Sequence, residues 1–200
     1  MLLPFYLEDC VEAGCDEAGR GCLAGPVVAA AVILPKDFSH PLLKDSKKLK
    51  VAHRNQLRKI IETEALAFAV SFVDNHTIDH INILKASILA MHQSLDKLSL
   101  KPEHIIVDGN RFYKYKNLPH QTIVKGDDKF ASIAAASILA KTYRDEFMEE
   151  MHRQYPQYAW NQNMAYATKK HREAIEKHGP CPLHRKSFKL LADTQLRVDL

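Results

Sequence analysis

Two apolar runs near the amino terminus are separated by an acidic pair and a glycine turn, and this arrangement constrains the fold most. Residues 11–15 lead directly into Asp16-Glu17 and Gly19-Arg20-Gly21, and Gly25-Pro26 precedes the continuous apolar run 27–34. We expect both runs to be strands, with glycines that allow a tight turn between them. Neighbouring side chains of a regular strand point to opposite faces. If Asp16 and Glu17 share one site, the first strand should therefore end or bulge between them.

The acidic pair has two interpretations. It is either a solvated surface turn or part of a site for a hard cation such as Mg²⁺ or Mn²⁺, because carboxylates offer only acceptor oxygens. Asp16 and Glu17 alone favour the surface turn. The choice depends on which partners the rest of the chain supplies.

The remaining apolar periodicity predicts alternating strands and helices. A stretch of small residues, Ser132 to Ser137, would let its helix lie close against a sheet or a ligand. Thr77 is a plausible N-cap for the most strongly periodic helix. The predicted strands are 66–73, 104–107 and 121–124, and the predicted helices are 49–61, 77–98, 129–149 and 168–177. The fold class is therefore α/β, with a mixed sheet flanked by helices.

Length and composition are those of an ordinary globular protein. The chain has 200 residues, of which 46% are hydrophobic and 26% charged. We expect one domain over 1–200, with a sheet core to about 150 and a basic, helical C-terminal portion over 151–200. No apolar run approaches the ~20 residues of a membrane span, and the first residues do not read as a secretory signal. The four cysteines form no C-x-x-C pair, which favours a reducing, cytoplasmic location.

Positive charge is concentrated in two places, although the net charge is only +4. Seven Lys or Arg residues lie between Lys169 and Lys189, against two glutamates. A second cluster consists of Lys44, Lys47, Lys48 and Lys50. Each cluster is either a solvated face or a contact surface for a phosphate backbone.

Three predicted strands end in acids, namely Asp16-Glu17, Asp108 and Asp127. Ligand sites in α/β sheets form beyond the carboxyl ends of strands, so these acids could converge there. Four carboxylates without cations would repel one another. With two divalent ions roughly 3.5–4 Å apart, the same cluster becomes a clamp for displacement at phosphorus. A zinc site on His76 and His80, four residues apart, is a weaker alternative because no general base lies between them.

The chain resembles the type 2 ribonuclease H family, which includes bacterial ribonuclease HII, over nearly its whole length. Any one of the matching segments would be weak evidence, but their order is specific. They are Asp16-Glu17-Ala18-Gly19-Arg20-Gly21, Leu23-Ala24-Gly25-Pro26-Val27, Asp45-Ser46-Lys47-Lys48-Leu49, Asn82-Ile83-Leu84, Val107-Asp108-Gly109-Asn110, Lys125-Gly126-Asp127, the helical stretch from Ser132 to Lys141, and His184-Arg185-Lys186-Ser187-Phe188.

The resemblance implies a ribonuclease H-like fold and endonucleolytic cleavage of RNA in RNA–DNA hybrids. It also implies cutting 5′ to single ribonucleotides embedded in duplex DNA. Two-metal hydrolysis with Mn²⁺ or Mg²⁺ would leave a 5′-phosphate and a 3′-hydroxyl, one ion activating water and the other stabilising the leaving oxygen. The family's metal-binding carboxylates match Asp16, Glu17, Asp108 and Asp127. Asp128 would be an acid at a helix N-terminus.

The resemblance also suggests substrate contacts. The Gly19-Arg20-Gly21 turn could read the 2′-hydroxyl of a ribonucleotide with its backbone groups. Tyr166 stands where the family places a tyrosine that stacks on the next deoxyribose. The preceding Met164-Ala165 replaces a common Lys-Gly, which could weaken or shift junction recognition. The candidates for phosphate contacts are Lys47, Lys48, Lys141, Arg144, Arg185, Lys186 and Ser187, the last of which could instead cap a turn.

Partners and rival functions follow from the same comparison. Gln195-Leu196-Arg197-Val198-Asp199-Leu200 loosely resembles a bacterial sliding-clamp peptide, although the six residues alone favour an ordinary disordered terminus. We expect a monomer without membrane contact. One rival is a ribonuclease HIII-like hybrid nuclease. We expect the chain to be too short for the large extra N-terminal binding domain of that type. The other is a non-catalytic hybrid-binding protein, which would gain nothing from four acids facing phosphates.

Overall fold

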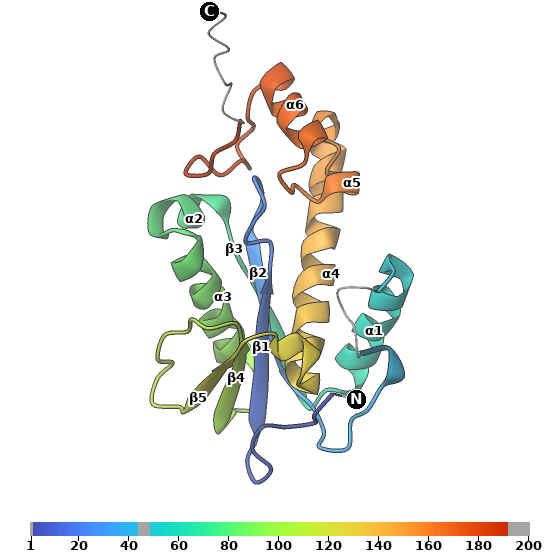
Figure 1. Cartoon of the computed structure of the whole chain (residues 1–200), viewed down its shortest axis with the longest axis vertical. Helices are drawn as coiled ribbons and strands as arrows, with labels where there is room; N and C mark the ends of the chain where they lie inside the picture. Colours follow the sequence, from blue (N-terminus) through green and yellow to red (C-terminus); the bar gives the residue numbers. More distant parts are fainter. Residues whose placement is uncertain (1, 44–48, 192–200) are drawn as a thin grey trace, which may run out of the picture.

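The centre of the molecule is a five-stranded mixed sheet with the order β3-β2-β1-β4-β5 (Figure 1). The computed structural model describes residues 2–43 and 49–191. The strands are β1 (Glu12–Ala18), β2 (Val27–Ile33), β3 (Ala67–Val73), β4 (His104–Asp108) and β5 (His120–Ile123). β1, β4 and β5 are parallel to one another, whereas β2 is antiparallel to both β1 and β3. This confirms the expected mixed α/β architecture.

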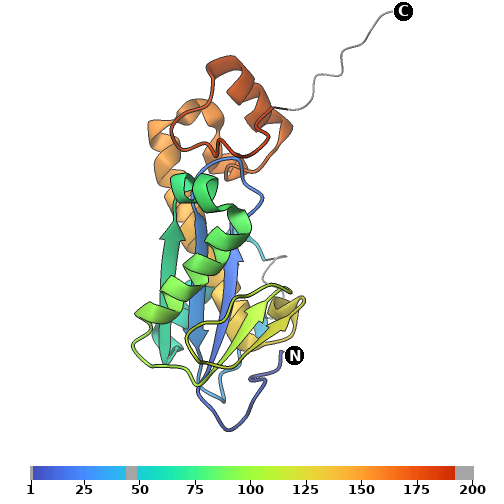
Figure 2. The same ribbon diagram turned by 90° about the vertical axis from the view of Figure 1, so that its left-hand side faces the viewer.

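Helices cover both faces of the sheet (Figures 1 and 2). α3 packs on one face, over a core that includes Ala29, Val73 and Leu95. α4 and α1 share the other face, where Leu57 and Ile61 of α1 meet the alanines of α4. The helices are α1 (Val51–Glu64), α2 (Asn75–Ile81), α3 (Ile83–Lys97), α4 (Ala131–Gln154), α5 (Trp160–Asn163) and α6 (Lys169–His178), with 3₁₀ turns η2 (Gly126–Asp128) and η3 (Pro156–Tyr158).

α4 lies directly against β1 because both present small residues at their contact. A Cβ atom added to Gly14 would lie 2.3 Å from the carbonyl carbon of Ser132 and 2.5 Å from the amide nitrogen of Ile133. Ala134, Ala135 and Ala136 are fully buried beside this contact. The small-residue stretch therefore acts as expected, allowing a helix backbone to approach a strand backbone.

The predicted continuous helix 77–98 is wrong, because the chain breaks between α2 and α3. Asn82 has a φ of 70° and its side chain accepts a hydrogen bond from the Lys85 amide, so it caps α3. Asp74, rather than Thr77, caps α2 by accepting a hydrogen bond from the Thr77 amide. Asparagine tolerates the left-handed region better than most residues. The apolar spacing continues through this break, so the periodicity gave no signal of it.

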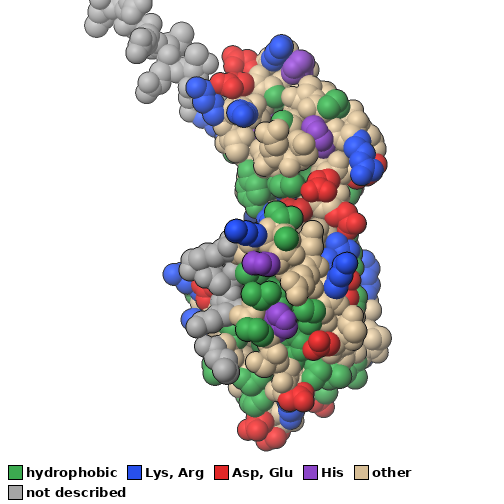
Figure 3. Space-filling model, turned by 90° about the vertical axis from the view of Figure 1, so that its right-hand side faces the viewer, with side chains coloured by type: hydrophobic (Ala, Val, Ile, Leu, Met, Phe, Trp, Pro, Cys, Tyr) green, Lys and Arg blue, Asp and Glu red, His purple; other side chains and the backbone are tan. Residues whose placement is uncertain are grey.

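The C-terminal portion sits beyond the end of the sheet and is carried by α4 (Figure 1). Trp160, Tyr158 and Ile175 form a small separate core there, with Met148 of α4. α4 runs past residue 150, so the expected limit between the sheet core and this portion falls within one helix. The space-filling view shows the molecule narrowing between the two parts (Figure 3). Among the described residues, no helix is long and apolar enough to cross a membrane.

Candidate active site

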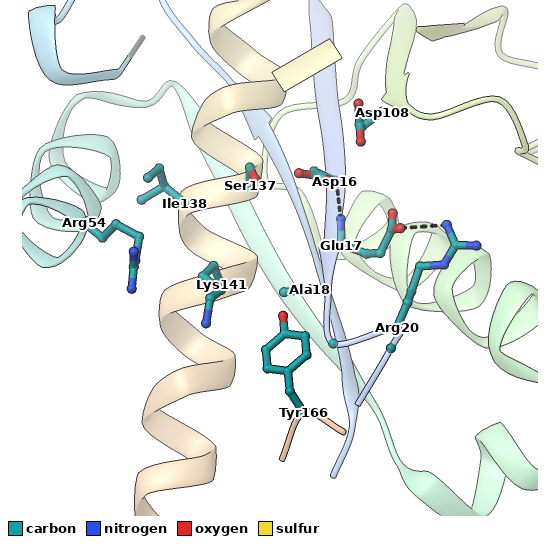
Figure 4. A pocket seen from close by; sticks show the side chains of 12 residues that line it. Asp16, Glu17, Ala18, Arg20, Arg54, Asp108, Ser137, Ile138, Lys141 and Tyr166 are labelled. Atoms are coloured by element: carbon teal, nitrogen blue, oxygen red, sulfur yellow. Dashed lines mark hydrogen bonds and ion pairs between the residues drawn. The ribbon is translucent and has the colours of Figure 1, made fainter. Parts of the chain in front are cut away.

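A pocket of about 450 Å³ lies where β1 continues past the end of β4 (Figure 4). Asp16, Glu17 and Asp108 contribute its carboxylates, and α4 forms the facing wall through Ser137 and Lys141. The other lining residues are Ala18, Gly19, Arg20, Gly21, Arg54, Ile138 and Tyr166. Acids from two adjacent parallel strands thus meet at the carboxyl edge of the sheet, as expected.

The prediction that β1 ends or bulges between Asp16 and Glu17 is wrong. β1 stays regular, and both residues pair with β2 opposite Ala30 and Ala29. Asp16 therefore faces α4, while Glu17 faces the opposite side of the sheet. Both acids nevertheless line the pocket, because the pairing between β1 and β4 stops at Cys15 and the β1 edge beyond it is open on that side.

Asp108 is the last residue of β4 and is oriented by the turn that follows β5. Val107 pairs with Cys15, so Asp108 lies beside the start of the acidic pair. Its Oδ1 accepts a hydrogen bond of 2.7 Å from the Gly126 amide. A Cβ on Gly126 would lie 2.6 Å from Cδ1 of Ile133, so a larger residue there would require the Ile133 side chain to shift. The turn after β5 therefore holds Asp108 in place through the Gly126 amide.

Asp127 follows Gly126 in η2 and is only 1% exposed. It does not line the pocket with the other three acids. Within residues 2–43 and 49–191, no three acids, histidines or cysteines are close enough to form a ready-made metal cage. Convergence of all four predicted acids on one cation site therefore stays a prediction, with Asp127 one residue from the amide that binds Asp108.

The acids are held in an environment that disfavours their charged forms. Burial raises the pKa of Asp16 well above its usual range, the charges of Glu17 and Asp108 raise it further, and a hydrogen bond from Ser137 partly opposes them. Burial also raises the pKa of Glu17, although the Arg20 guanidinium opposes this at 3.0 Å. A divalent cation would relieve the repulsion and stabilise the ionised carboxylates. The donor set therefore fits an oxygen-preferring metal ion.

The facing wall is basic. Lys141 of α4 forms an ion pair with Asp145, whose other oxygen lies 3.9 Å from Arg54 of α1. Lys141 was among the expected phosphate contacts, whereas Arg54 and Ser137 were missed. The small-residue stretch that contains Ser137 was a usable signal, because small residues also allow a ligand to approach. Nothing in the spacing of α1 distinguished Arg54 from its basic neighbours.

The predicted substrate-binding turn and tyrosine meet in this pocket. Gly19, Arg20 and Gly21 line it, and the 41% exposed ring of Tyr166 enters it from the C-terminal portion. Cys22 forms an isolated bridge with Tyr166, which joins the two segments. Arg20 uses its guanidinium to bind Glu17.

Other predicted contacts do not reach the pocket. Arg185 and Arg144 are 0% and 1% exposed, and their guanidinium groups donate to backbone carbonyls, so the expected phosphate contacts of both are wrong. Ser187 donates through its amide and its hydroxyl to Asp79 of α2, at 2.9 and 2.6 Å, and it does not line the pocket, so its phosphate contact stays a prediction. Lys47 and Lys48, like the peptide 195–200, lie outside the described residues.

Comparison with known proteins decides the family. The ribonuclease HII family model matches residues 13–191. The chain belongs to the ribonuclease HII family. Its similarity to the ribonuclease HII of Bacteroides thetaiotaomicron is 60% identity over 199 residues, covering 100% of each chain. The chain is 52% identical to the ribonuclease HII of Porphyromonas gingivalis, and the match covers 96% of each chain. As a member of this family, the chain is a divalent-metal-dependent endonuclease for RNA–DNA hybrids.

Solved structures confirm the ribonuclease H-like fold. The ribonuclease HII in a complex with PCNA from Archaeoglobus fulgidus is 26% identical, with a TM-score of 0.77 over 92% of this chain and 98% of that one. Ribonuclease H2 from Pyrococcus horikoshii has a TM-score of 0.76 at 24% identity, covering 90% and 94%. A Bst ribonuclease HIII in complex with Mn²⁺ has a TM-score of 0.70 at 21% identity, covering 92% of this chain but 69% of that one.

Proposed function

We propose that this protein hydrolyses RNA in RNA–DNA hybrids and also cuts 5′ to single ribonucleotides in duplex DNA, leaving 5′-phosphate and 3′-hydroxyl ends. The observation that carries the proposal is the pocket that brings three acids together with the Gly19-Arg20-Gly21 turn and Tyr166. Cleavage and recognition of the ribose need both sets of groups at one scissile phosphate.

We assign metal binding and catalysis to the four acids Asp16, Glu17, Asp108 and Asp127. Two Mn²⁺ or Mg²⁺ ions would supply activation of water and stabilisation of the leaving oxygen when bound. Burial of Asp16 and Asp127, 5% and 1% exposed, limits competition from solvent. The Gly126 amide orients Asp108, and Arg20 restrains Glu17. The protein residues thus place negative charge at the carboxyl edge of the sheet without using a flexible loop for it.

Recognition is assigned to the backbone of residues 19–21 and to Tyr166. A 2′-hydroxyl both donates and accepts hydrogen bonds, which suits backbone amides and carbonyls at close range. The ring of Tyr166 supplies a stacking surface that tolerates any base sequence. Lys141 faces the acids across the pocket and is suited to a phosphate. The lost Lys-Gly before Tyr166 would tune this recognition without touching the carboxylates.

The test is cleavage of duplex DNA that carries one ribonucleotide, with Mn²⁺, with Mg²⁺ and without metal. We expect one cut 5′ to the ribonucleotide, strictly dependent on metal, and nearly abolished in Asp108→Asn. Asp96→Asn is a matched control, because Asp96 lies on α3, outside the pocket, and binds Lys116. Binding of the duplex without cleavage in any metal would instead support the non-catalytic rival.

The same assay separates ribonuclease HII from ribonuclease HIII behaviour. A HIII-like enzyme would cut a continuous RNA–DNA hybrid but handle the single ribonucleotide poorly. Identities of 52–61% to ribonuclease HII proteins, against 21% to a ribonuclease HIII, support the HII assignment.

A sliding-clamp contact through residues 195–200 is a second proposal. It is supported by the Gln195-Leu196-Arg197-Val198-Asp199-Leu200 pattern and by the PCNA complex of the Archaeoglobus fulgidus relative. Deleting these six residues should abolish binding to the bacterial clamp while leaving cleavage of a short duplex unchanged. Equal clamp affinity before and after the deletion would refute it.

A further inference from the structure

Two buried arginines stand between the glycine turn and the segment that carries Tyr166. Arg144, on α4, is 1% exposed and donates three hydrogen bonds. They run from Nε to the Pro26 carbonyl at 3.1 Å, from Nη2 to Ala24 at 3.1 Å and from Nη1 to Met164 at 2.9 Å. One guanidinium therefore joins the loop after β1 to the residues just before Tyr166.

Arg185, from the segment after α6, binds the same loop from the other side. It is fully buried. Its Nε donates to the Gly25 carbonyl at 3.0 Å, Nη1 to Arg20 at 3.0 Å and Nη2 to Pro26 at 3.1 Å. The Arg20 carbonyl belongs to the turn that lines the pocket. The Pro26 carbonyl is shared by both arginines.

This arrangement is costly to build for stability alone. Two positive charges are buried close together, and burial followed by the Arg144 charge lowers the pKa of Arg185 to about 10. Replacing buried charges by apolar side chains is often neutral or stabilising. A planar guanidinium, however, can hold several carbonyls at fixed angles, which neither an apolar side chain nor a lysine can do. The geometry of the loop is therefore what the arginines provide.

The contacts reach the recognition groups directly. Gly19 packs on Arg144 so closely that an added Cβ would lie 2.1 Å from its Nε. Met164 and Ala165 both adopt left-handed backbone, with φ of 46° and 62°, a conformation that needs outside support. The Leu23 amide donates to the Ala165 carbonyl at 2.8 Å, closing the connection from the loop side.

We propose that Arg144 and Arg185 are positioning residues that hold the Gly19-Arg20-Gly21 turn and Tyr166 in one fixed geometry and thereby set discrimination of a ribonucleotide from a deoxyribonucleotide. The proposal rests on the proposed function, because it assigns a cause to the recognition described there. Neither arginine lines the pocket; both act through backbone carbonyls, and the Arg144 guanidinium also lies 6.0 Å from the centre of the Tyr166 ring. The consequence is that specificity depends on residues with no surface in the pocket.

The experiment measures a ratio of two dissociation constants. An Asp108→Asn protein, in which cleavage is blocked, is titrated with a short duplex that carries one ribonucleotide and with the all-DNA duplex of the same sequence. Arg144→Lys, Arg185→Lys and Arg185→Met are added to that background. Arg153→Met is the control, because Arg153 lies on the same helix but is exposed and binds Glu150. Since both duplexes use the same preparation, partial unfolding of a variant cancels in the ratio.

We expect the parent protein to prefer the ribonucleotide duplex. Each of the three arginine variants should lose about fivefold or more of that preference, the value of roughly one hydrogen bond. Affinity for the all-DNA duplex should stay unchanged, and Arg153→Met should keep the full ratio. If the variants at Arg144 and Arg185 retain the parent ratio, the positioning role of the arginines is overturned, whereas the proposed function is not affected. A parent protein without preference would instead overturn the recognition part of the proposed function.

Discussion

The two glycines of the Gly19-Arg20-Gly21 turn differ in whether the fold of the chain requires them. Gly19 has a φ of 95° and contacts Arg144, so both its backbone and its lack of a side chain are required by the fold. Gly21 has no left-handed backbone, and nothing lies within 4 Å of an added Cβ. Glycine at position 21 is therefore not required by the packing of the chain itself. Its place in the lining of the pocket offers another reason for it.

Gly21→Ala should separate folding from recognition. The free energy of unfolding should change by less than about 0.5 kcal/mol, since the methyl group meets no protein atom. Cleavage at a single ribonucleotide should fall by about tenfold or more, because the methyl group would displace the substrate from the turn. Thermal unfolding and single-turnover cleavage measure the two effects. The comparison variant is Gly19→Ala, which should lose about 1–3 kcal/mol of stability.

Among the elements, the contact between β1 and α4 places the acids opposite the basic wall. It depends on Gly14, whose absent side chain lets the two backbones meet at Ser132. Gly14→Ala should therefore destabilise the protein by about 3 kcal/mol, since the strand and the helix must separate. Urea unfolding gives the value.

Gly109→Ala is the matched control for this prediction. Gly109 also lies beside the acids, but an added Cβ has open space around it. Its φ of 95° limits the expected cost to backbone strain of about 1–2 kcal/mol. Equal destabilisation by the two substitutions would show that the contact with Ser132 is not what makes Gly14 necessary.

A pair of histidines joins α6 to the segment that carries Tyr166. His184 Nδ1 accepts from the Cys181 amide at 2.9 Å, and Trp160 donates to His171 Nε2 at 3.0 Å. His171 Nδ1 can therefore donate to the Tyr166 carbonyl, 3.0 Å away. The bonds that His184 Nδ1 and His171 Nε2 accept require neutral rings, so protonation of either histidine would break one of them.

This arrangement predicts an acid-sensitive C-terminal portion. Burial, and then the nearby His171, lower the pKa of His184 from 6.5 to about 4. Between these values the unfolded chain binds a proton that the folded chain does not, so the free energy of unfolding falls as the pH drops from 6.5 to 4. We expect a loss on the order of 1 kcal/mol after solvent screening.

Urea unfolding at several pH values tests the effect. His184→Gln should flatten the dependence between neutral and acidic pH, whereas His178→Gln, at the exposed end of α6, should leave it unchanged. A dependence that survives in His184→Gln would assign the acid sensitivity to other groups.

At the scale of the whole molecule, some basic side chains that the sequence suggested as contacts for a phosphate backbone instead bind groups within the protein. Two of the seven basic residues between Lys169 and Lys189 are used internally, since Arg185 is buried and Arg172 donates to the carbonyls of Lys189 and Leu190. On the face that carries α1, basic and acidic side chains lie beside one another (Figure 3), and Arg58 binds both Glu62 and Glu146. A modest number of phosphate contacts follows from this distribution.

Substrate affinity should accordingly fall about tenfold between 50 and 200 mM salt, as for roughly two neutralised phosphates. Lys141→Ala should lower the slope of log affinity against log salt by about 0.9. Lys116→Ala, which only breaks a surface pair with Asp96, should leave the slope unchanged. Fluorescence anisotropy at four salt concentrations gives the slopes, and an unchanged slope in Lys141→Ala would remove that residue from the phosphate contacts.

The sequence by itself determined the order of the strands and of the longer helices, the mixed sheet and the family, but neither the break between α2 and α3 nor α5. Apolar periodicity and motif order are local properties of the chain, and they carry that information directly. It also supplied the acids, because Asp16, Glu17 and Asp108 each stand at the end of an apolar run.

Only the tertiary structure decided how those residues meet. Asp16 and Glu17 share a pocket because β4 ends beside them, not because β1 bends. Arg144 and Arg185 look like phosphate contacts in a basic sequence, yet packing turns them inward to backbone carbonyls, and five of their six hydrogen bonds join residues 118 to 165 positions apart. The end of a neighbouring strand and the partner of a buried charge are set by distant parts of the chain, so no local pattern could reveal them.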